Sequence, residues 1–372
     1  MKIAIATFFN AANYGAMLQA YALWQYLAQK GHDVQFVLYS PTQQPKLTLA
    51  SCFVARSLQG LRIKLRTYVR QSMSAFADPF PRTRLFDSYG DLEQNPPEAD
   101  VFIVGSDQMW NPAWVLPHLP YVFLDFAPPS SKRIAYAASF ATSQWGADKR
   151  DEVATLLSQF DAISVREQSG VGIVKELADR EASLVVDPTL LWDAAFFTSL
   201  CKNARPPRRE PFVFSYFLDE WSGTAEERMC LDACLDQLGI SKVVTDKTPV
   251  AGWLSPLYNM LGVTAKVSVE EWLISLKSAS FVVTNSFHGT IFSILFQRPF
   301  LAVLLTSRMS AMNERIVSLL NDLELQDRMI YPGDNEKIAK VVTQPIQWEK
   351  VSDRVKELRT VAISFFDQAG IS

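Results

Sequence analysis

Short apolar runs that alternate with helical stretches limit what this chain can fold into more than any other feature of its sequence. Residues 2–6 and 34–38 have the composition of buried strands, and residues 15–30 between them carry apolar side chains at helical spacing. Two strands joined through a helix pair in parallel, because a parallel connection needs a crossover of that kind. The start of the chain therefore predicts a parallel α/β sheet, which we expect to continue with strands at 101–104, 134–138, 162–165 and 184–186.

The same alternation begins again after a basic, proline-rich connector at 205–211. The expected strands are 212–218, 242–245, 281–284 and 300–305, and the expected helices are 225–238, 269–279 and one that opens at 285–290 and runs to about 296. We therefore predict an α/β fold with two Rossmann-like domains around a cleft. The N-terminal domain is expected at 1–204, the C-terminal domain at 205–347, and a closing helix at 348–372.

Residues 41–97 interrupt this pattern and are expected to leave the sheet as a basic excursion. The part from 56 to 72 fits an anionic membrane surface. The alternative is a helix with a solvated basic face. No acidic residue occurs from 34 to 77, whereas this stretch carries Lys46, Arg56, Arg62, Lys64, Arg66 and Arg70.

The composition argues against several classes of protein. With 48% hydrophobic and 20% charged residues, the chain has the make-up of a globular protein. Its 36 Lys and Arg are balanced by 39 Asp and Glu, a net charge of -3, so we expect no nucleic-acid partner. No apolar run reaches the roughly 18 residues of a membrane-spanning helix.

The four cysteines form no CxxC pair, so we expect free thiols and a cytoplasmic protein. If residues 56–72 bind lipid, the protein would be peripheral to the inner face of the membrane.

Ligands of open α/β sheets bind at the carboxyl ends of the strands, so a site is expected in the turns that follow them. The first such turn holds Asn13, Tyr14 and Gly15 at the start of a helix, whose free N–H groups suit an anion or a hydroxyl-rich ligand. The alternative is that Asn13 only caps the helix and that Tyr14 packs in the core. The motif GxGxxG is absent, which argues against a dinucleotide site.

The turn after the strand at 101–104 is dense in polar groups. Ser106, Asp107 and Gln108 supply a hydroxyl, a carboxylate and an amide, and Trp110 supplies an indole. Sugar binding uses this combination, because the hydroxyls need polar partners while the apolar face of the ring packs on an aromatic side chain. The alternative is a polar turn beside a buried tryptophan.

Arg166 follows the strand at 162–165 and is a candidate for binding a carboxylate or a phosphate through its planar guanidinium. An ion pair with Glu167 or across the domain interface is the alternative. Asp187 closes another strand in the sequence Asp187-Pro188-Thr189, which is typical of a structural turn, so we rank it below the other candidates.

His288 is the strongest catalytic candidate among the three histidines of the chain. It lies between a predicted strand and a predicted helix, where it can bind a phosphate together with the helix N-terminus and transfer a proton near neutral pH. No GxSxG elbow supports a serine hydrolase, and no His/Cys/carboxylate spacing supports a metal site. The polar and small residues around it are Asn285, Ser286, Gly289 and Thr290.

Taken together, these motifs resemble one family, the polysaccharide pyruvyl transferases. The resemblance runs from residue 3 to about residue 330 and leaves out the basic excursion and the last helix. The matching strings are Asn13-Tyr14-Gly15-Ala16 with Leu18-Gln19-Ala20-Tyr21-Ala22-Leu23, Gly105-Ser106-Asp107-Gln108 with Trp110-Asn111, Ala135-Tyr136-Ala137-Ala138-Ser139, Ser164-Val165-Arg166-Glu167, Val186-Asp187-Pro188-Thr189-Leu190-Leu191 and Thr284-Asn285-Ser286-Phe287-His288-Gly289.

The resemblance implies a glycosyltransferase-B-like fold and an enzyme that moves pyruvate from phosphoenolpyruvate to two hydroxyls of one sugar. The product would be a cyclic ketal in a bacterial-type surface polysaccharide or its precursor, with release of phosphate. The N-terminal domain would bind the sugar acceptor and the C-terminal domain the donor. A membrane contact through residues 56–72 would suit a lipid-linked acceptor. Since phosphoenolpyruvate is itself a substrate, no cofactor is expected.

The resemblance also implies roles for particular residues. His288 would be a phosphate ligand or the general acid, Arg166 the clamp on the carboxylate or phosphate, and Asp107 the base or the group that orients a hydroxyl. The expected donor site further includes Asn285, Ser286, Gly289 and Thr290, and the expected acceptor site comprises Asn13, Tyr14, Gly15, Ser106, Gln108 and Trp110.

One position departs from the family pattern. Some members carry an arginine two residues before this histidine, where the present chain has Ser286. A hydroxyl does not replace a bidentate cation, so we expect Arg308 or Arg315 to supply the charge. The alternatives to pyruvyl transfer are a nucleotide-sugar-dependent glycosyltransferase of the same two-domain shape and a non-catalytic glycan- or nucleotide-binding protein.

Overall fold

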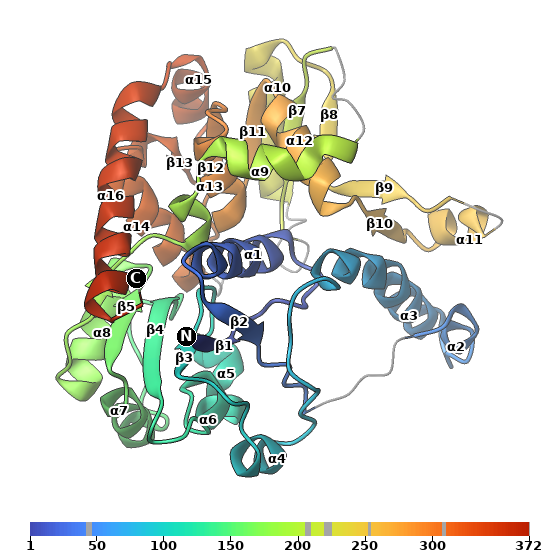
Figure 1. Cartoon of the computed structure of the whole chain (residues 1–372). Coiled ribbons are helices and arrows are strands. Elements are labelled where there is room, and N and C mark those ends of the chain that lie inside the picture. Colours follow the sequence, from blue (N-terminus) through green and yellow to red (C-terminus); the bar gives the residue numbers. More distant parts are fainter. Residues whose placement is uncertain (42–46, 205–209, 219–224, 252–253, 307–309, 372) are drawn as a thin grey trace.

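Two parallel sheets, one from each half of the sequence, form the body of the molecule (Figure 1). Helices cover both faces of the sheets, as the figure shows. The alternation of strands and helices along the sequence therefore predicted the fold class correctly. The computed structural model describes residues 1–41, 47–204, 210–218, 225–251, 254–306 and 310–371.

The first sheet has six strands in the order β2-β1-β3-β4-β5-β6 among the described residues. Every neighbouring pair is parallel, so the carboxyl ends of these strands lie along one edge. The predicted strands overlap the observed ones, although β6 ends two residues before the expected limit of 186. The strands are β1 (Lys2–Ala6), β2 (Asp33–Phe36), β3 (Val101–Val104), β4 (Lys132–Ala138), β5 (Ala162–Val165) and β6 (Ser183–Leu184).

The second sheet is also parallel and has five strands in the order β13-β12-β11-β7-β8 within the described segments. Its central strand, β11, leads directly into the helix that carries His288. The short β13 was not predicted from the sequence. The strands are β7 (Val213–Tyr216), β8 (Val243–Thr245), β11 (Phe281–Thr284), β12 (Phe300–Val303) and β13 (Met329–Ile330).

The helices predicted at 15–30, 225–238, 269–279, 285–296 and 348–372 are present as α1, α10, α12, α13 and α16, whereas α4, α9, α11 and α15 were not predicted. In the first half they are α1 (Tyr14–Gln29), α2 (Leu49–Cys52), α3 (Leu58–Arg70), α4 (Tyr89–Gln94), α5 (Pro112–Val115), α6 (Leu119–Val122), α7 (Arg150–Ser158), α8 (Gln168–Ala178) and α9 (Ala194–Leu200). In the second half they are α10 (Ala225–Leu238), α11 (Ser255–Met260), α12 (Val269–Ser278), α13 (Phe287–Leu295), α14 (Glu314–Asp322), α15 (Asn335–Thr343) and α16 (Trp348–Gln368).

Helix α1 connects the two halves of the molecule. Most of its residues are apolar and buried, as expected for a helix with protein on several sides. Tyr14 stacks on Trp272 of α12 with ring centroids 5.1 Å apart, and its hydroxyl donates a hydrogen bond to the carbonyl of Val267. One apolar core therefore runs from the first sheet into the second.

The closing helix is present as α16 and returns from the second half of the chain to the first. Phe366 stacks on Tyr136 of β4 with ring centroids 4.3 Å apart. Arg359 donates hydrogen bonds to the carbonyls of Leu190 and Trp192. Because residues 205–209 lie outside the described part, the boundary between the two predicted domains stays a prediction.

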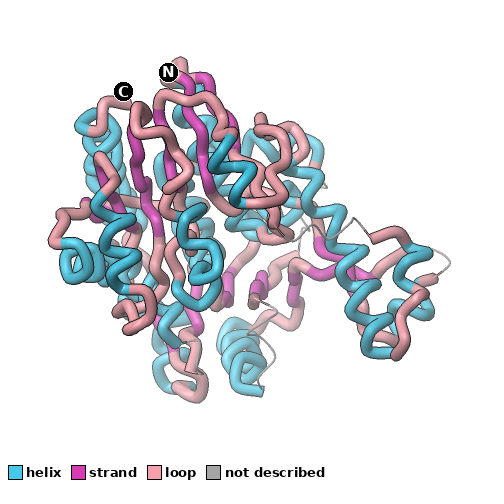
Figure 2. The backbone as a smooth tube through the Cα atoms, turned by 90° about the horizontal axis from the view of Figure 1, so that it is seen from below, coloured by secondary structure: helices cyan, strands magenta, loops and turns pink. Residues whose placement is uncertain are grey.

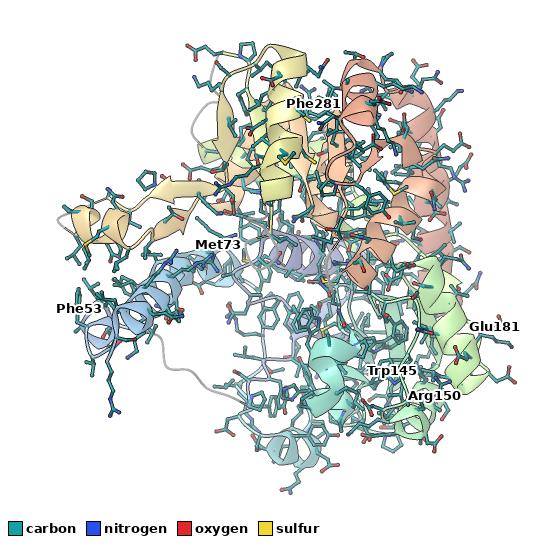
Figure 3. The ribbon with its side chains drawn as sticks, turned by 180° about the vertical axis from the view of Figure 1, so that it is seen from behind. Phe53, Met73, Trp145, Arg150, Glu181 and Phe281 are labelled. Carbon is teal, nitrogen blue, oxygen red and sulfur yellow. The ribbon has the colours of Figure 1, made fainter. Side chains whose placement is uncertain are left out.

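The basic excursion builds a projecting lobe together with a second excursion that the sequence analysis did not anticipate (Figure 2). Residues 47–77 contribute α2 and α3, and residues 247–266 contribute α11 and an antiparallel pair, β9 (Lys247–Pro249) with β10 (Thr264–Lys266). We call these two segments the lobe. In Figure 3, Phe53 lies at its outer end and Met73 lies where it joins the body.

Candidate active site

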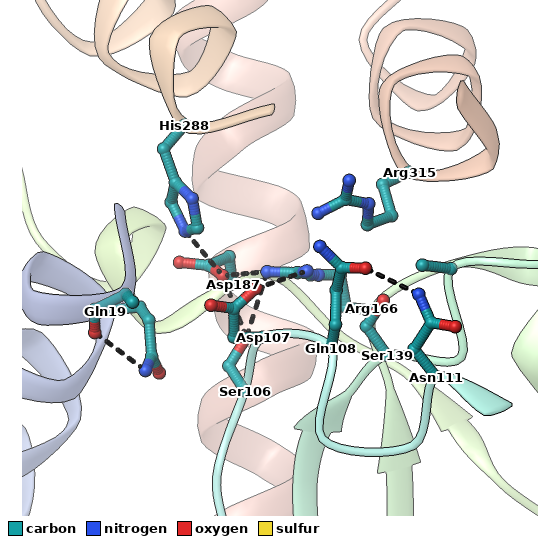
Figure 4. A network of polar contacts seen from close by, with 12 residues as sticks. Gln19, Ser106, Asp107, Gln108, Asn111, Ser139, Arg166, Asp187, His288 and Arg315 are labelled. Atoms are coloured by element: carbon teal, nitrogen blue, oxygen red, sulfur yellow. Dashed lines mark hydrogen bonds and ion pairs between the residues drawn. The ribbon is translucent and has the colours of Figure 1, made fainter. Parts of the chain in front are cut away.

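The predicted polar residues meet where the carboxyl ends of the first sheet face α13 and α14 (Figure 4). The turns after β3, β5 and β6 bring Ser106, Arg166 and Asp187 to this edge. The other side of the site comes from the second half of the chain, through His288 and Arg315. Parallel strands explain the meeting, because their carboxyl ends share one edge of the sheet.

Asp187 is the centre of the polar network, and its side chain is fully buried. Its Oδ2 accepts hydrogen bonds from Ser106 Oγ at 2.8 Å and from Arg166 Nη1 at 2.7 Å, and it lies 3.5 Å from His288 Nε2. Its Oδ1 accepts from the backbone N–H and the hydroxyl of Thr189. One carboxylate thus joins a cation, a hydroxyl and the imidazole.

These contacts set the charge of Asp187. Burial by itself would raise the pKa of this carboxyl. The proximity of His288, the guanidinium of Arg166 and the backbone N–H of Thr189 outweigh burial and hold the pKa well below its ordinary value. Asp187 therefore stays ionised throughout the physiological range.

Arg166 is held rigidly in the site. Its Nη2 lies 3.5 Å from Asp107 Oδ1, opposite the stronger contact with Asp187. The guanidinium also lies over the ring of Phe287, 4.3 Å from the centroid, which is a favourable cation–π distance. The alternative of an ion pair with Glu167 is weak, because Nε and Oε2 are 3.9 Å apart.

Glu167 anchors the loop after β4 instead. Its Oε1 accepts hydrogen bonds from Ser139 Oγ and from the backbone N–H groups of Phe140 and Ala141. Burial raises the pKa of Glu167, and the charge of Arg166 opposes this shift. We therefore assign Glu167 to positioning rather than to chemistry.

His288 lies in the first turn of α13, buried against the start of α1. The helix is capped by Ser286, whose hydroxyl accepts a hydrogen bond from the N–H of Gly289. The Nε2 atom of His288 has no hydrogen-bond partner among the described residues, and the carboxylate of Asp187 is its near neighbour. This pairing suits an imidazole that exchanges a proton.

Gly15 makes room for the imidazole of His288. A Cβ atom at this position would lie 2.0 Å from Nδ1 of His288, far inside van der Waals contact. The close approach of α1 to α13 therefore requires glycine. Gly15 thus lies against His288, the catalytic candidate. Its expected role in binding the acceptor stays a prediction.

Replacing Gly15 with alanine is expected to displace the imidazole and to lower turnover at least tenfold, because a displacement of about 1 Å at a reacting group costs about 10²-fold. Gly172 in α8 is the matched control, since nothing lies within 4 Å of a Cβ placed there. Initial rates and urea unfolding of both variants would check this. Equal activity of the two variants would show that Gly15 does not hold His288 in place.

Arg315 faces Arg166 across the site (Figure 4). Its side chain is buried, and its Nε donates to the carbonyl of Met312. No carboxylate lies within ion-pair distance of it in the described segments, although the charges of Asp107, Glu167 and Asp187 act on it from further away. Burial, followed by the like charge of Arg166, lowers the pKa of Arg315 to about 10. A buried cation without an ion-pair partner is suited to an anionic ligand.

Asp107 and Gln108 border the same site. Asp107 has a left-handed backbone conformation with φ of 70°, and its main chain bridges to Ala138 of the neighbouring strand. The side-chain oxygen of Gln108 accepts hydrogen bonds from Asn111 and Trp114. These contacts fix the loop after β3 against β4.

The structure corrects several expected roles. Trp110 is fully buried, its indole donates to the carbonyl of Val122 and it stacks on Phe123, so it cannot be an aromatic platform for a sugar. The hydroxyl of Tyr14 is likewise bound to Val267 inside the core. Both residues have polar neighbours in the sequence, but their rings lie in the core because burial of apolar surface stabilises the fold.

The side chains of other predicted site residues form hydrogen bonds with the backbone. Asn13 caps α1 by accepting from the N–H of Ala16, and Asn285 accepts from the N–H of Leu218. The hydroxyl of Thr290 donates to the carbonyl of Ser286 within α13. Arg308 lies outside the described residues, so of the two arginines considered, Arg315 is the one that the structure places at the site.

The sequence analysis ranked Asp187 too low and missed Phe287. The Asp-Pro turn has the structural role that was expected, but the same carboxylate also holds Arg166 and lies beside His288. Asp187 follows a strand of the same sheet as Arg166, and this position in the sequence could have identified it as a site residue. Phe287 had no such signal, because its contact with Arg166 crosses between the two halves.

One known family matches most of the chain, including the turns that supply this site. The family model described as polysaccharide pyruvyl transferase matches residues 13–307. The chain belongs to the polysaccharide pyruvyl transferase family. Membership in this family indicates a transferase. The match begins at the cap of α1 and includes every turn that supplies the network around Asp187.

Solved structures of other enzymes share the fold. A UDP-N-acetylglucosamine 2-epimerase structure from Listeria monocytogenes is 8% identical and covers 99% of this chain and 97% of its own, with a TM-score of 0.51. UGT89C1 from Arabidopsis thaliana, complexed with quercetin, is 11% identical and covers 100% of this chain and 99% of its own, with a TM-score of 0.49. The likeness to the epimerase structure shows that the chain has the predicted glycosyltransferase-B-like fold. No curated protein matches the chain.

Proposed function

We propose that this chain transfers pyruvate from phosphoenolpyruvate to two hydroxyls of one sugar in a bacterial-type surface polysaccharide or its precursor. The observation that carries the proposal is the buried Arg315, which faces Arg166 and has no ion-pair partner among the described residues. Phosphoenolpyruvate carries a carboxylate and a phosphate, so a pair of guanidinium groups matches its two anionic ends. Membership in the family is consistent with this donor.

The N-terminus of α13 adds to the attraction for an anion. This helix of nine residues begins at Phe287, and the helix dipole places partial positive charge beside His288. The missing arginine at Ser286 is then replaced in space by Arg315, which comes from α14 rather than α13. We assign the donor site to Arg166, Arg315, His288 and the first turn of α13.

The reaction requires balanced proton transfers. A proton is added to the methylene carbon of phosphoenolpyruvate while the first sugar hydroxyl forms a C–O bond to C2. The C2–O bond to phosphate then breaks, and the second hydroxyl forms the other C–O bond of the ketal. The two hydroxyls release two protons, which matches the one gained by the new methyl group and the one gained by phosphate.

We assign the acid to His288 and the base to Asp107. The carboxylate of Asp187 lies 3.5 Å from Nε2 of His288, where it can hold the imidazole in place while the ring transfers a proton. Asp107 lies on the other side of Arg166 and comes from the half that we assign to the acceptor. Gly15 and Gln108 border that side and complete the proposed acceptor site, with Ser106 holding Asp187 in place.

We also propose a cytoplasmic location for this reaction. Cys52, Cys201 and Cys234 are buried free thiols, which favours a reducing compartment. We further propose that the reaction uses no cofactor, since phosphoenolpyruvate, the source of the pyruvyl group, is itself a substrate.

Replacing Arg315 with methionine is expected to weaken binding of phosphoenolpyruvate about 10- to 100-fold, because a hydrogen bond to a charged group contributes about 1.5–3 kcal/mol. The free energy of unfolding should stay the same or rise, since the variant removes a buried charge without an ion-pair partner. Calorimetric titration with phosphoenolpyruvate and urea unfolding measure the two quantities. Arg354 on α16, which forms an exposed pair with Glu357, is the matched control for an arginine-to-methionine change.

The same titration separates the proposed function from its alternatives. Wild-type protein should bind phosphoenolpyruvate and release phosphate when a suitable sugar is added. Binding of UDP- or GDP-sugars in place of phosphoenolpyruvate would show a glycosyltransferase. Binding of a sugar or nucleotide without any turnover would show a non-catalytic protein.

A further inference from the structure

The lobe has a small core of its own, built from both excursions. Cys52 and Leu65 pack with Tyr258 and Val263, so α3 is held against α11 and β10. Segments that are about 200 residues apart in the sequence thereby form one surface. The lobe projects to one side of the body, with Phe53 at its outer end (Figure 3).

The lobe concentrates positive charge. Residues 47–77 and 247–266 contain seven Lys and Arg and no Asp or Glu, whereas the whole chain has a net charge of -3. The remainder of the chain therefore carries -10. Arg56 and Arg62 are exposed on the lobe, and Lys266 is paired with Asp246 at its base. Such a separation of charge gives the lobe an attraction for anionic surfaces that the rest of the molecule lacks.

The same lobe exposes apolar side chains. It carries five of the thirteen large hydrophobic residues that are exposed in the described segments, although it makes up a small part of the chain. Four of the five are aliphatic, and they cluster around α2, the start of α3 and α11. The five are Phe53 at 46%, Val54 at 75%, Leu58 at 70%, Ile63 at 57% and Met260 at 70% relative exposure.

We propose that the lobe docks on the surface of a bilayer that contains anionic phospholipids. Exposed aliphatic side chains beside Lys and Arg are the combination used by interfacial helices, in which apolar groups enter the acyl boundary and cations meet the headgroups. None of the described helices is long and apolar enough to span a membrane, so the contact is peripheral.

Two other occupants fit the lobe less well. A second copy of the chain docked lobe to lobe would bring two clusters of seven positive charges together. Nucleic acid would pair with the cations, but single strands stack on aromatic rings, and the exposed apolar residues here are mainly aliphatic. Only a bilayer uses both the charge and the aliphatic groups.

Flotation with lipid vesicles tests the proposal in the absence of donor and acceptor, so the result does not depend on pyruvyl transfer. The wild-type chain should float with vesicles of mixed phosphatidylcholine and phosphatidylglycerol and stay unbound with phosphatidylcholine alone. The double variants Leu58→Ser/Ile63→Ser and Arg56→Glu/Arg62→Glu should each lower binding more than tenfold. Matched controls away from the lobe are Met229→Ser/Val361→Ser and Lys340→Glu/Lys350→Glu, which should bind as the wild type does.

Several results would overturn the proposal. Absence of flotation with anionic vesicles would do so, as would equal binding by the lobe variants and their controls. Binding to soluble heparin together with loss of flotation in the charge variant alone would identify a polyanion rather than a bilayer. Dimerisation seen by analytical ultracentrifugation and lost in Leu58→Ser/Ile63→Ser would identify a second copy.

Discussion

Replacing His288 with alanine is expected to lower the rate of pyruvyl transfer by about 10² to 10⁴-fold, the usual contribution of a general acid. The imidazole is buried beside the carboxylate of Asp187 and in the first turn of α13, where it can deliver a proton to the methylene carbon of the donor. The measurement is the rate of phosphate release from phosphoenolpyruvate in the presence of a sugar acceptor. His118, in the loop before α6, is the matched control and should tolerate alanine without loss of rate.

The kinetic parameters distinguish the two roles proposed for His288. A general acid acts in the transition state, so kcat should fall while the dissociation constant for phosphoenolpyruvate changes little. A phosphate ligand would instead weaken binding of the donor. A total loss of less than tenfold would remove His288 from the role of acid.

Replacing Asp187 with asparagine is expected to lower the free energy of unfolding by about 3–5 kcal/mol, because it leaves the buried Arg166 without its strongest ion pair. Urea unfolding followed by fluorescence measures this change. Asp91 forms an exposed pair with Arg84, so Asp91→Asn is the matched control and should cost less than about 1 kcal/mol. An equal effect of the two substitutions would contradict the central role of Asp187.

The effect of Asp187→Asn should also depend on pH. Because the folded state holds the pKa of this carboxyl below its ordinary value of about 3.9, the carboxylate stabilises the fold above that pH and loses this contribution as the pH falls. The difference in stability between the wild type and the variant should therefore be largest above about pH 5 and shrink below about pH 4. A difference that does not change with pH would show that the variant acts through packing rather than charge.

Much of the fold follows from local patterns. The strands Val101–Val104, Ala162–Val165 and Phe281–Thr284 have the limits that their apolar runs predict. Buried parallel strands are apolar along their whole length, so each strand is visible by itself. The excursion at 247–266 was missed because its strands are short and half exposed.

The site was predictable in position but not in its contacts. Polar residues after apolar strands indicated the edge of the first sheet where Arg166 and Asp107 lie, and His288 faces this edge from α13. The sequence alone did not show that Trp110 is buried in the core. Nor did it show that Asp187 binds Arg166 at the centre of the site. The direction in which a turn residue points depends on what packs against it.

The sequence by itself determined the two series of strands, the parallel sheets, the family and the turns that supply the candidate site. These properties depend on periodicity and on motifs that span a few residues. Only the tertiary structure decided that Asp187 binds Ser106, 81 residues away, that Arg315 faces Arg166, and that two excursions form one basic lobe. Such pairings depend on how the two halves pack, and packing couples side chains that no local pattern connects.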